Sequence, residues 1–181
     1  MDASGCITAL AVGSAAAGAF SDIRTGHIPN WLTLGTLAVA PLLWFGAATA
    51  DAGVAAGLQA LGASALGAGL CGIGPAMLFF RGGLGGGDVK LLAALGALLG
   101  PRIGLHAELF GFLFAALFVP GKLAWQGTLF SVIRGVLRSL ANPFLPRSKQ
   151  RPAPAELAMR LRLGPAIFLG TLAAFVHGRF V

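Results

Sequence analysis

The sequence predicts an all-α, polytopic membrane protein, and three observations support this prediction. Of the 181 residues, 56% are hydrophobic and only 10% are charged, a balance that soluble domains of this size do not normally show. Several apolar runs reach the length of about 20 residues that a helix needs to cross roughly 30 Å of hydrocarbon. These runs also lack the alternating polarity of barrel strands. We therefore expect about six transmembrane helices.

The expected helices follow the apolar runs in chain order. Pro29 and Asn30 suit a turn and the start of the second helix, and the third helix is long and contains Gly74 and Pro75 near its end. The fourth is short, which fits a helix that begins below the membrane surface after a glycine-rich re-entrant turn. The six spans are expected at about residues 3–21, 29–49, 53–80, 88–100, 104–121 and 164–178.

The positive charges predict an orientation. The excess of 13 Lys and Arg over 6 Asp and Glu could suggest nucleic acid, but in a membrane chain the placement of the charges matters more than their sum. We therefore expect no nucleic-acid partner. With the N-terminus outside, only Arg102 and Arg179 lie outside, and the other eleven of the 13 lie on the cytoplasmic side. This orientation brings Asp22 and Asp88 to the same, cytoplasmic face.

A long polar and basic segment, residues 122–163, separates the last two spans. Within it, residues 128–140 place apolar side chains on one side and Ser131, Arg134 and Arg138 on the other. This spacing predicts an amphipathic helix on the cytoplasmic leaflet, with its arginines toward anionic headgroups; a solvated loop helix is the alternative. We interpret residues 1–181 as a single membrane-embedded domain that carries this insertion.

Two aspartates near the ends of spans are candidate functional residues. An ionisable group at membrane depth is unfavourable, so Asp22 and Asp88 are functional candidates, with structural ion pairs to Arg24 and Lys90 as the alternative. Two carboxylates within a few Å of each other can share one proton near neutral pH. One could then take a proton from water while the other donates to a scissile carbonyl oxygen. The pair would suit an aspartic protease.

The residues before Asp88 strengthen this interpretation. Gly85, Gly87 and Asp88 form a G-x-G-D pattern that Lys90 extends to G-x-G-D-x-K. Glycines there let the backbone approach a second chain closely, and the helix dipole favours an aspartate in the first turn of a helix. His27, after Asp22, is interpreted as a surface residue because no second His or Cys supports a metal site.

The three motifs together resemble those of the prepilin peptidases, polytopic aspartic proteases of the bacterial cytoplasmic (inner) membrane. They read "DIRTGHIPN", "GLGGGDVKLLAALG" and "RLGPAIFLGTLAAF", in the order of that family. The resemblance implies an aspartic endopeptidase that cleaves the basic leader from type IV pilin-like precursors, just before their hydrophobic helix. It implies Asp22 and Asp88 as the catalytic aspartates and Gly85 and Gly87 as active-site glycines, with no metal and no cofactor. Lys90 matches a common motif position.

The chain departs from the bifunctional members of that family. Those members also methylate the new pilin N-terminus and usually carry a cytoplasmic domain with paired CxxC motifs, which this sequence lacks. It therefore resembles the short, peptidase-only form associated with Flp-type tight-adherence pili, and N-methyltransferase activity is not expected. The alternative function is a small membrane transporter or pilus assembly factor that uses Asp22 and Asp88 as a proton or cation site.

Overall fold

The computed structural model describes residues 3–81, 83–125, 127, 130, 134 and 162–178, and this part of the chain forms helices and no strand. Four of its helices are long and apolar enough to cross a membrane, and one is shorter, so the predicted all-α membrane fold is confirmed. The amphipathic helix expected at 128–140 lies outside the described residues, apart from isolated positions. The helices are α1 (Ala3–Thr25), α2 (Asn30–Ala52), α3 (Val54–Phe80), α4 (Gly86–Trp125) and α6 (Gly164–Gly178).

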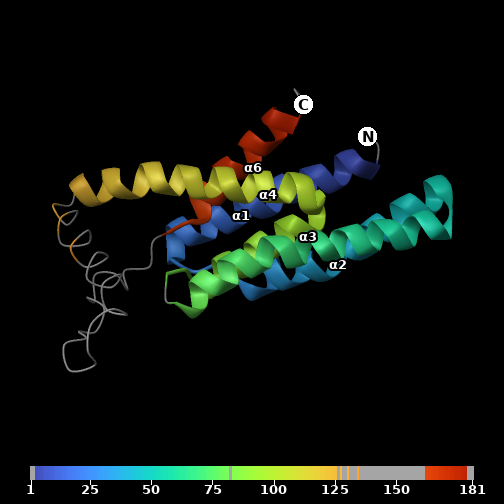
Figure 1. Cartoon of the computed structure of the whole chain (residues 1–181), viewed down its shortest axis with the longest axis horizontal. Helices are drawn as coiled ribbons and strands as arrows, with labels where there is room; N and C mark the ends of the chain where they lie inside the picture. The colour runs from blue at the N-terminus through green and yellow to red at the C-terminus, as the bar shows by residue number, and fades with distance from the viewer. Residues whose placement is uncertain are drawn as a thin grey trace. The chain divides into compact units, whose positions relative to one another are not determined.

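The fourth and fifth expected spans are one element, α4, that folds back on itself at Gly100. This glycine has φ 72° and ψ 174°, which interrupts the helix, and Figure 1 shows the chain reversing its direction there. A Cβ on Gly104 would lie only 3.0 Å from the Cα of Gly96, whereas residues eight apart in a straight helix are separated by about 12 Å. We call residues 86–99 the first arm and residues 101–115 the return arm.

The close packing at this reversal depends on three glycines, Gly67, Gly96 and Gly104. A Cβ on Gly96 would overlap the carbonyl oxygen of Gly67 on α3, and it would lie 2.7 Å from the Cβ of Cys71. A Cβ on Gly104 would lie 2.9 Å from the sulfur of the same cysteine. Side chains larger than hydrogen at these positions would therefore separate the two arms and α3, in the way that small residues control close helix packing in membranes.

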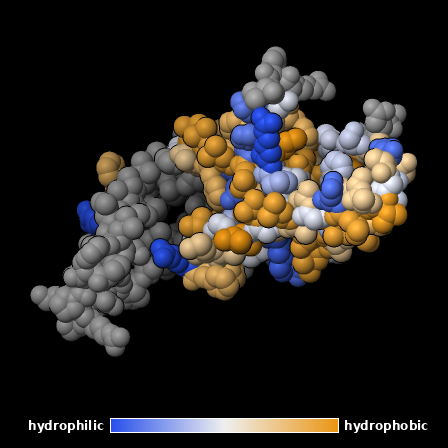
Figure 2. Space-filling model, turned by 45° about the vertical axis from the view of Figure 1, so that its right-hand side comes forward, coloured by the Kyte–Doolittle hydropathy of each residue, from blue (hydrophilic) through white to orange (hydrophobic). Residues whose placement is uncertain are grey.

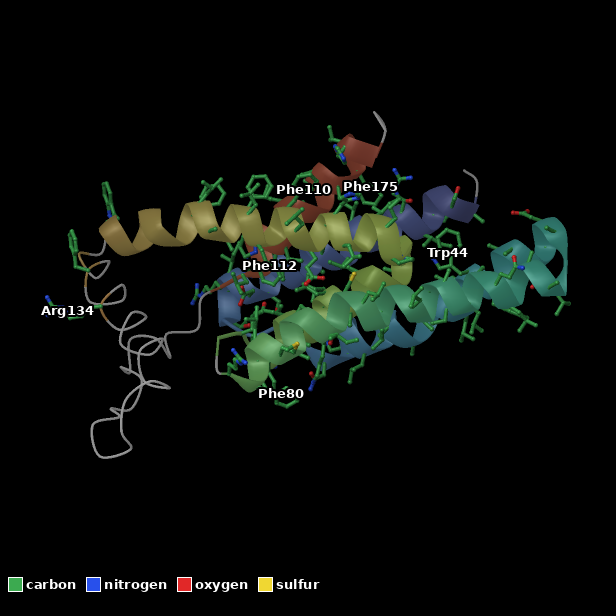
Figure 3. The ribbon with its side chains drawn as sticks, in the orientation of Figure 1. Trp44, Phe80, Phe110, Phe112, Arg134 and Phe175 are labelled. Atoms are coloured by element: carbon green, nitrogen blue, oxygen red, sulfur yellow. The ribbon has the colours of Figure 1, made fainter. Side chains whose placement is uncertain are left out.

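Polar side chains of α2 and α3 form hydrogen bonds with the last backbone carbonyls of the first arm. The break at Gly100 deprives the last carbonyls of this arm of partners within the helix, and a bilayer core offers no water to replace them. Ser64 Oγ donates to the carbonyl of Ala97 at 2.7 Å, and Trp44 Nε1 donates to that of Leu98 at 2.9 Å. Figure 3 shows Trp44 beside the reversal. These bonds fix the far end of the first arm.

The first arm is the most buried segment of the described bundle. Leu91, Leu95 and Leu98 are at most 1% exposed. The outer helices instead expose large apolar side chains, such as Leu42 of α2 and Ile73 of α3, and apolar residues cover much of the face in Figure 2. Such surfaces suit contact with lipid. This packing belongs to the compact unit made of Met1–Ala115 and Arg162–Val181; Ala116–Leu161 form a second unit.

Candidate active site

Asp22 lies in the last turn of α1, where it is only 6% exposed. The helix ends there because Gly26 adopts a φ of 67° and donates its N–H to the carbonyl of Asp22 at 2.9 Å, the left-handed C-cap that glycine favours. The hydroxyls of Ser21 and Thr25 donate to the carbonyl of His27 at 2.8 and 3.0 Å. These hydrogen bonds therefore hold the turn that follows Asp22 against the end of α1.

Asp88 lies in the first turn of α4 and is 7% exposed. The carbonyl of Gly85 accepts the N–H groups of Asp88 and Val89 at 3.1 and 3.3 Å, so Gly85 is the N-cap of the helix. A Cβ on Gly85 would lie 2.9 Å from Asp88 Oδ2. The carboxylate therefore turns back over Gly85, at the helix end whose dipole favours an anion.

Packing between α1 and the first arm brings the two aspartates to the same end of the bundle. A Cβ on Gly18 would lie 3.0 Å from Leu91 Cδ2. Gly18 precedes Asp22 by one turn, and Leu91 follows Asp88 by nearly one turn. Because α1 runs toward this end and the first arm runs away from it, both aspartates lie one turn beyond the same contact. Figure 1 shows the loops after α1 and after α3 at this end.

The contacts of the three consecutive glycines give a physical reason for the G-x-G-D spacing. A Cβ on Gly85 would crowd Asp88 Oδ2, and one on Gly87 would lie 3.2 Å from the Cβ of Ile28, in the loop after α1. A Cβ on Gly86 would meet nothing closer than Phe79 Cε2 at 3.4 Å, an ordinary contact. A side chain at the first or third position would thus displace a neighbouring group, whereas one at the middle position would not.

The predicted motif lysine links two helix starts. Lys90 Nζ donates to Asn30 Oδ1 at 3.0 Å, which joins the beginning of α4 to the beginning of α2. Pro29 is the N-cap of α2, with φ −67° and ψ 137°, as the sequence predicted for this turn. The lysine is thus engaged with α2 beside the candidate site.

Arg24, the alternative ion-pair partner of Asp22, points elsewhere. Its Cζ lies 4.4 Å from the ring centroid of Phe20, a cation–π contact along its own helix. In the described part of the chain no ion pair joins it to Asp22. The structural ion pair considered for Asp22 is therefore absent from these residues.

Sequence reasoning did not assign a role to the start of α6, which contacts Asp22 directly. The N–H of Gly164 donates to Asp22 Oδ2 at 3.0 Å, and Arg162 Nη1 donates to the carbonyl of Ile23 at 2.7 Å. The motif around Gly164 indicated a family resemblance, but neither residue type predicts a contact across about 140 positions of sequence. Ile28 was missed for the same reason.

Sequence reasoning also missed Glu108 on the return arm. Its Oε2 is buried and has no hydrogen-bond partner among the described residues. Its Oε1 would lie 3.3 Å from a Cβ on Gly74 of α3. The side chain lines a small pocket whose apolar walls include Leu92 and Leu163, which follow Asp88 and precede Gly164. An ionisable residue inside a predicted span was the signal that could have found it.

The arrangement is suited to moving protons. It holds two buried carboxylates at one end of a helical membrane bundle, each beside a helix terminus or a glycine turn. In the described part of the chain, no group of three or more His, Cys, Asp or Glu side chains could hold a metal ion. The class defined so far is an integral membrane protein with a buried pair of aspartates.

Comparison with known proteins identifies the family. The chain matches the type IV leader peptidase family over residues 9–120, a range that includes both aspartates and the glycine motif. Because the match covers more than half of the 181 residues, the chain belongs to this family. It is thus a protease with a type IV prepilin leader peptidase-like function, and prepilins are its implied substrates. No curated protein and no solved structure matches it.

Proposed function

We propose that this protein is a peptidase-only leader peptidase for Flp-type prepilins, and that Asp22 and Asp88 are its catalytic dyad. The observation that carries the proposal is the burial of both carboxylates at one end of the bundle, one turn beyond the Gly18 and Leu91 contact. The match to the type IV leader peptidase family supports the reaction class. The G-x-G-D spacing has its own steric reason at Gly85 and Gly87.

The proposed reaction needs one ionised and one protonated carboxyl group. The ionised group takes a proton from water while the water oxygen bonds to the scissile carbonyl carbon, and the protonated group gives its proton to the carbonyl oxygen. The tetrahedral intermediate then collapses: the carbon–nitrogen bond breaks as the nitrogen accepts the proton that the first carboxyl group took from water, and it leaves as the amine of the mature pilin. A hydroxyl of the intermediate returns its proton to the second carboxylate, so the leader ends in a new carboxyl group and both aspartates regain their starting states. Two neighbouring carboxylates favour this division because both cannot ionise comfortably.

We place the site at the cytoplasmic face of the bacterial inner membrane. The positive-inside bias supports this side. The exposed Arg102 follows the reversal at Gly100, at the opposite end of the first arm from Asp88, which agrees with the same orientation. The basic leader of a precursor would then be cut where it leaves the membrane, before the hydrophobic helix. The anionic cytoplasmic leaflet is the proposed surface for the basic insertion, residues 122–163.

The test is cleavage of a purified Flp-type prepilin by the detergent-solubilised or lipid-reconstituted protein, with the new N-terminus located by mass spectrometry. We expect cleavage at one bond near the end of the leader and no methylation when S-adenosylmethionine is added. Asp22→Asn and Asp88→Asn should each lower the cleavage rate by about 10²–10⁴-fold, the usual contribution of a positioned acid or base.

Asp51→Asn is the matched control, because Asp51 is an exposed aspartate at the end of α2 and undergoes the same isosteric change. It should cleave at the wild-type rate. Thermal unfolding of all three variants should show that they remain folded. Substantial activity in either Asp22→Asn or Asp88→Asn would disprove the dyad, and cleavage of other prepilin classes only would disprove the Flp assignment.

A further inference from the structure

The segment that leads into α6 makes two hydrogen bonds to the last turn of α1, one to a backbone carbonyl and one to the neighbouring aspartate side chain. The Arg162 guanidinium donates to the carbonyl of Ile23 at 2.7 Å, and the Gly164 N–H donates to Asp22 Oδ2 at 3.0 Å. The carbonyl of Ile23 belongs to the last turn of α1, where helices leave carbonyls without partners in the helix. The α6 segment therefore completes the end of α1 and touches the proposed catalytic carboxylate in the same place.

The N–H of Gly164 is well suited to this contact. The carbonyl of Leu163 accepts the N–H of Ile167 at 2.9 Å, so Gly164 is the first residue of the helix, where backbone N–H groups have no partner within the helix. The next residue, Pro165, has no N–H. Gly164 thus supplies a donor at the positive end of α6, which attracts a carboxylate, and Asp22 caps this helix from a different helix.

Only glycine allows this close approach. A Cβ at position 164 would lie 2.8 Å from the Cβ of Asp22 and 3.0 Å from the Cα of Ala19. The second contact is with backbone, which cannot rotate away. Ordinary van der Waals contact begins at 3.4 Å, so a methyl group would push Asp22 and α6 apart by at least 0.6 Å, the difference between 3.4 and 2.8 Å.

We propose that Gly164 is a positioning residue for Asp22, with Arg162 holding the α1 turn that bears this aspartate. The inference rests on the proposed function. The N–H bond holds Oδ2 and so restricts the orientation of the carboxylate, which leaves Oδ1 for the proton transfer of the proposed reaction. Catalytic groups displaced by about 1 Å can lose about 10²-fold in rate. The start of α6 therefore acts on the rate of the chemical step and not on substrate affinity.

The first experiment is a kinetic comparison of Gly164→Ala with two other glycine variants of α6. A Cβ at Gly178 would meet nothing within 4 Å, whereas one at Gly170 would overlap the backbone N of Gly111 on the return arm. We expect Gly164→Ala to lower kcat about 10- to 100-fold with KM little changed. Gly178→Ala should behave as wild type, and Gly170→Ala should lose thermal stability while keeping more of its kcat.

Equal losses of kcat in Gly170→Ala and Gly164→Ala would overturn the proposal, because general misplacement of α6 would then explain both. Arg162→Lys and Arg162→Gln provide a second test should Gly164→Ala fail to fold. Lysine keeps a charged donor for the Ile23 carbonyl, so Arg162→Lys should retain more kcat than Arg162→Gln. Equal, wild-type kcat in both Arg162 variants would count against a role for this residue.

A measurement that needs no activity separates this inference from the proposed function. In protein labelled with ¹⁵N-glycine, the amide proton of Gly164 should resonate downfield, as expected for a bond to a carboxylate, and should shift upfield in Asp22→Asn. The Gly178 amide is the internal reference and should not move. No shift of the Gly164 amide would overturn the contact itself. If the Gly164 amide shifts as expected but the protein cleaves no prepilin, the contact is supported and the peptidase assignment is rejected.

Discussion

Alanine substitutions along Gly85, Gly86 and Gly87 should give three different results, although the three residues are chemically identical and adjacent. A Cβ on Gly85 would lie 2.9 Å from Asp88 Oδ2. Ordinary contact begins at 3.4 Å, so the carboxylate oxygen must move by at least 0.5 Å, the difference between these values. The oxygen is the end of a flexible side chain, so we expect activity to fall while stability changes little.

We expect Gly85→Ala to lower kcat/KM about 10- to 100-fold, the range for a catalytic group displaced by up to about 1 Å. Gly86→Ala is the matched control, because its Cβ would make only an ordinary contact with Phe79. Its activity should be that of the wild type, and removing glycine from a helix start should stabilise the protein by up to about 0.5–1 kcal/mol.

Gly87→Ala tests packing more than chemistry. Its Cβ would lie 3.2 Å from the Cβ of Ile28, which is 3% exposed and anchors the loop after α1 against α4. We expect a lower thermal midpoint than in Gly86→Ala and a smaller loss of activity than in Gly85→Ala. The assays are prepilin cleavage at several substrate concentrations and thermal unfolding in one detergent. Full activity of Gly85→Ala, or an equal loss in Gly86→Ala, would refute the steric account of the G-x-G-D motif.

Two further predictions concern the Lys90–Asn30 hydrogen bond and Glu108. Lys90→Met and Asn30→Ala should each destabilise the protein by about 1 kcal/mol or less, because each breaks the same exposed hydrogen bond. Thermal unfolding of the double variant should show no further loss of stability. Fully additive losses in the double variant would mean that the bond is not formed. Glu108→Met should raise the thermal midpoint, because it removes a buried carboxyl oxygen without a partner in the described chain, a group whose burial costs about 1–3 kcal/mol. A lower midpoint would indicate that this oxygen is hydrogen-bonded, for example to a buried water.

Much of the fold follows from local sequence. The expected starts and ends of the first three helices lie close to Ala3–Thr25, Asn30–Ala52 and Val54–Phe80, because a bilayer selects apolar runs of a given length one segment at a time. Local sequence also made Asp22 and Asp88 candidate functional residues, since a carboxylate near membrane depth is unfavourable. The structure buries both side chains, and their role stays a prediction.

The position of the break in α4 was predicted, because the fourth expected span ends at about residue 100 and the helix breaks at Gly100. The close packing of the two arms was not predictable in the same way. It depends on contacts of Gly96 and Gly104 with Gly67 and Cys71 of α3, which belong to different segments of the sequence. Residues 101–103, which the expected spans leave out, are helical in the structure.

The amino-acid sequence by itself determined which segments enter the membrane and which carboxylates are candidates for chemistry, because both depend on the free energy of single segments and single charges in a bilayer. Only the tertiary structure decided which groups surround those carboxylates. Gly164 meets Asp22 across 142 positions of sequence, and Gly87 meets Ile28, because the shapes of packed helices match there. Such matches are properties of pairs of distant segments, and no single segment contains them.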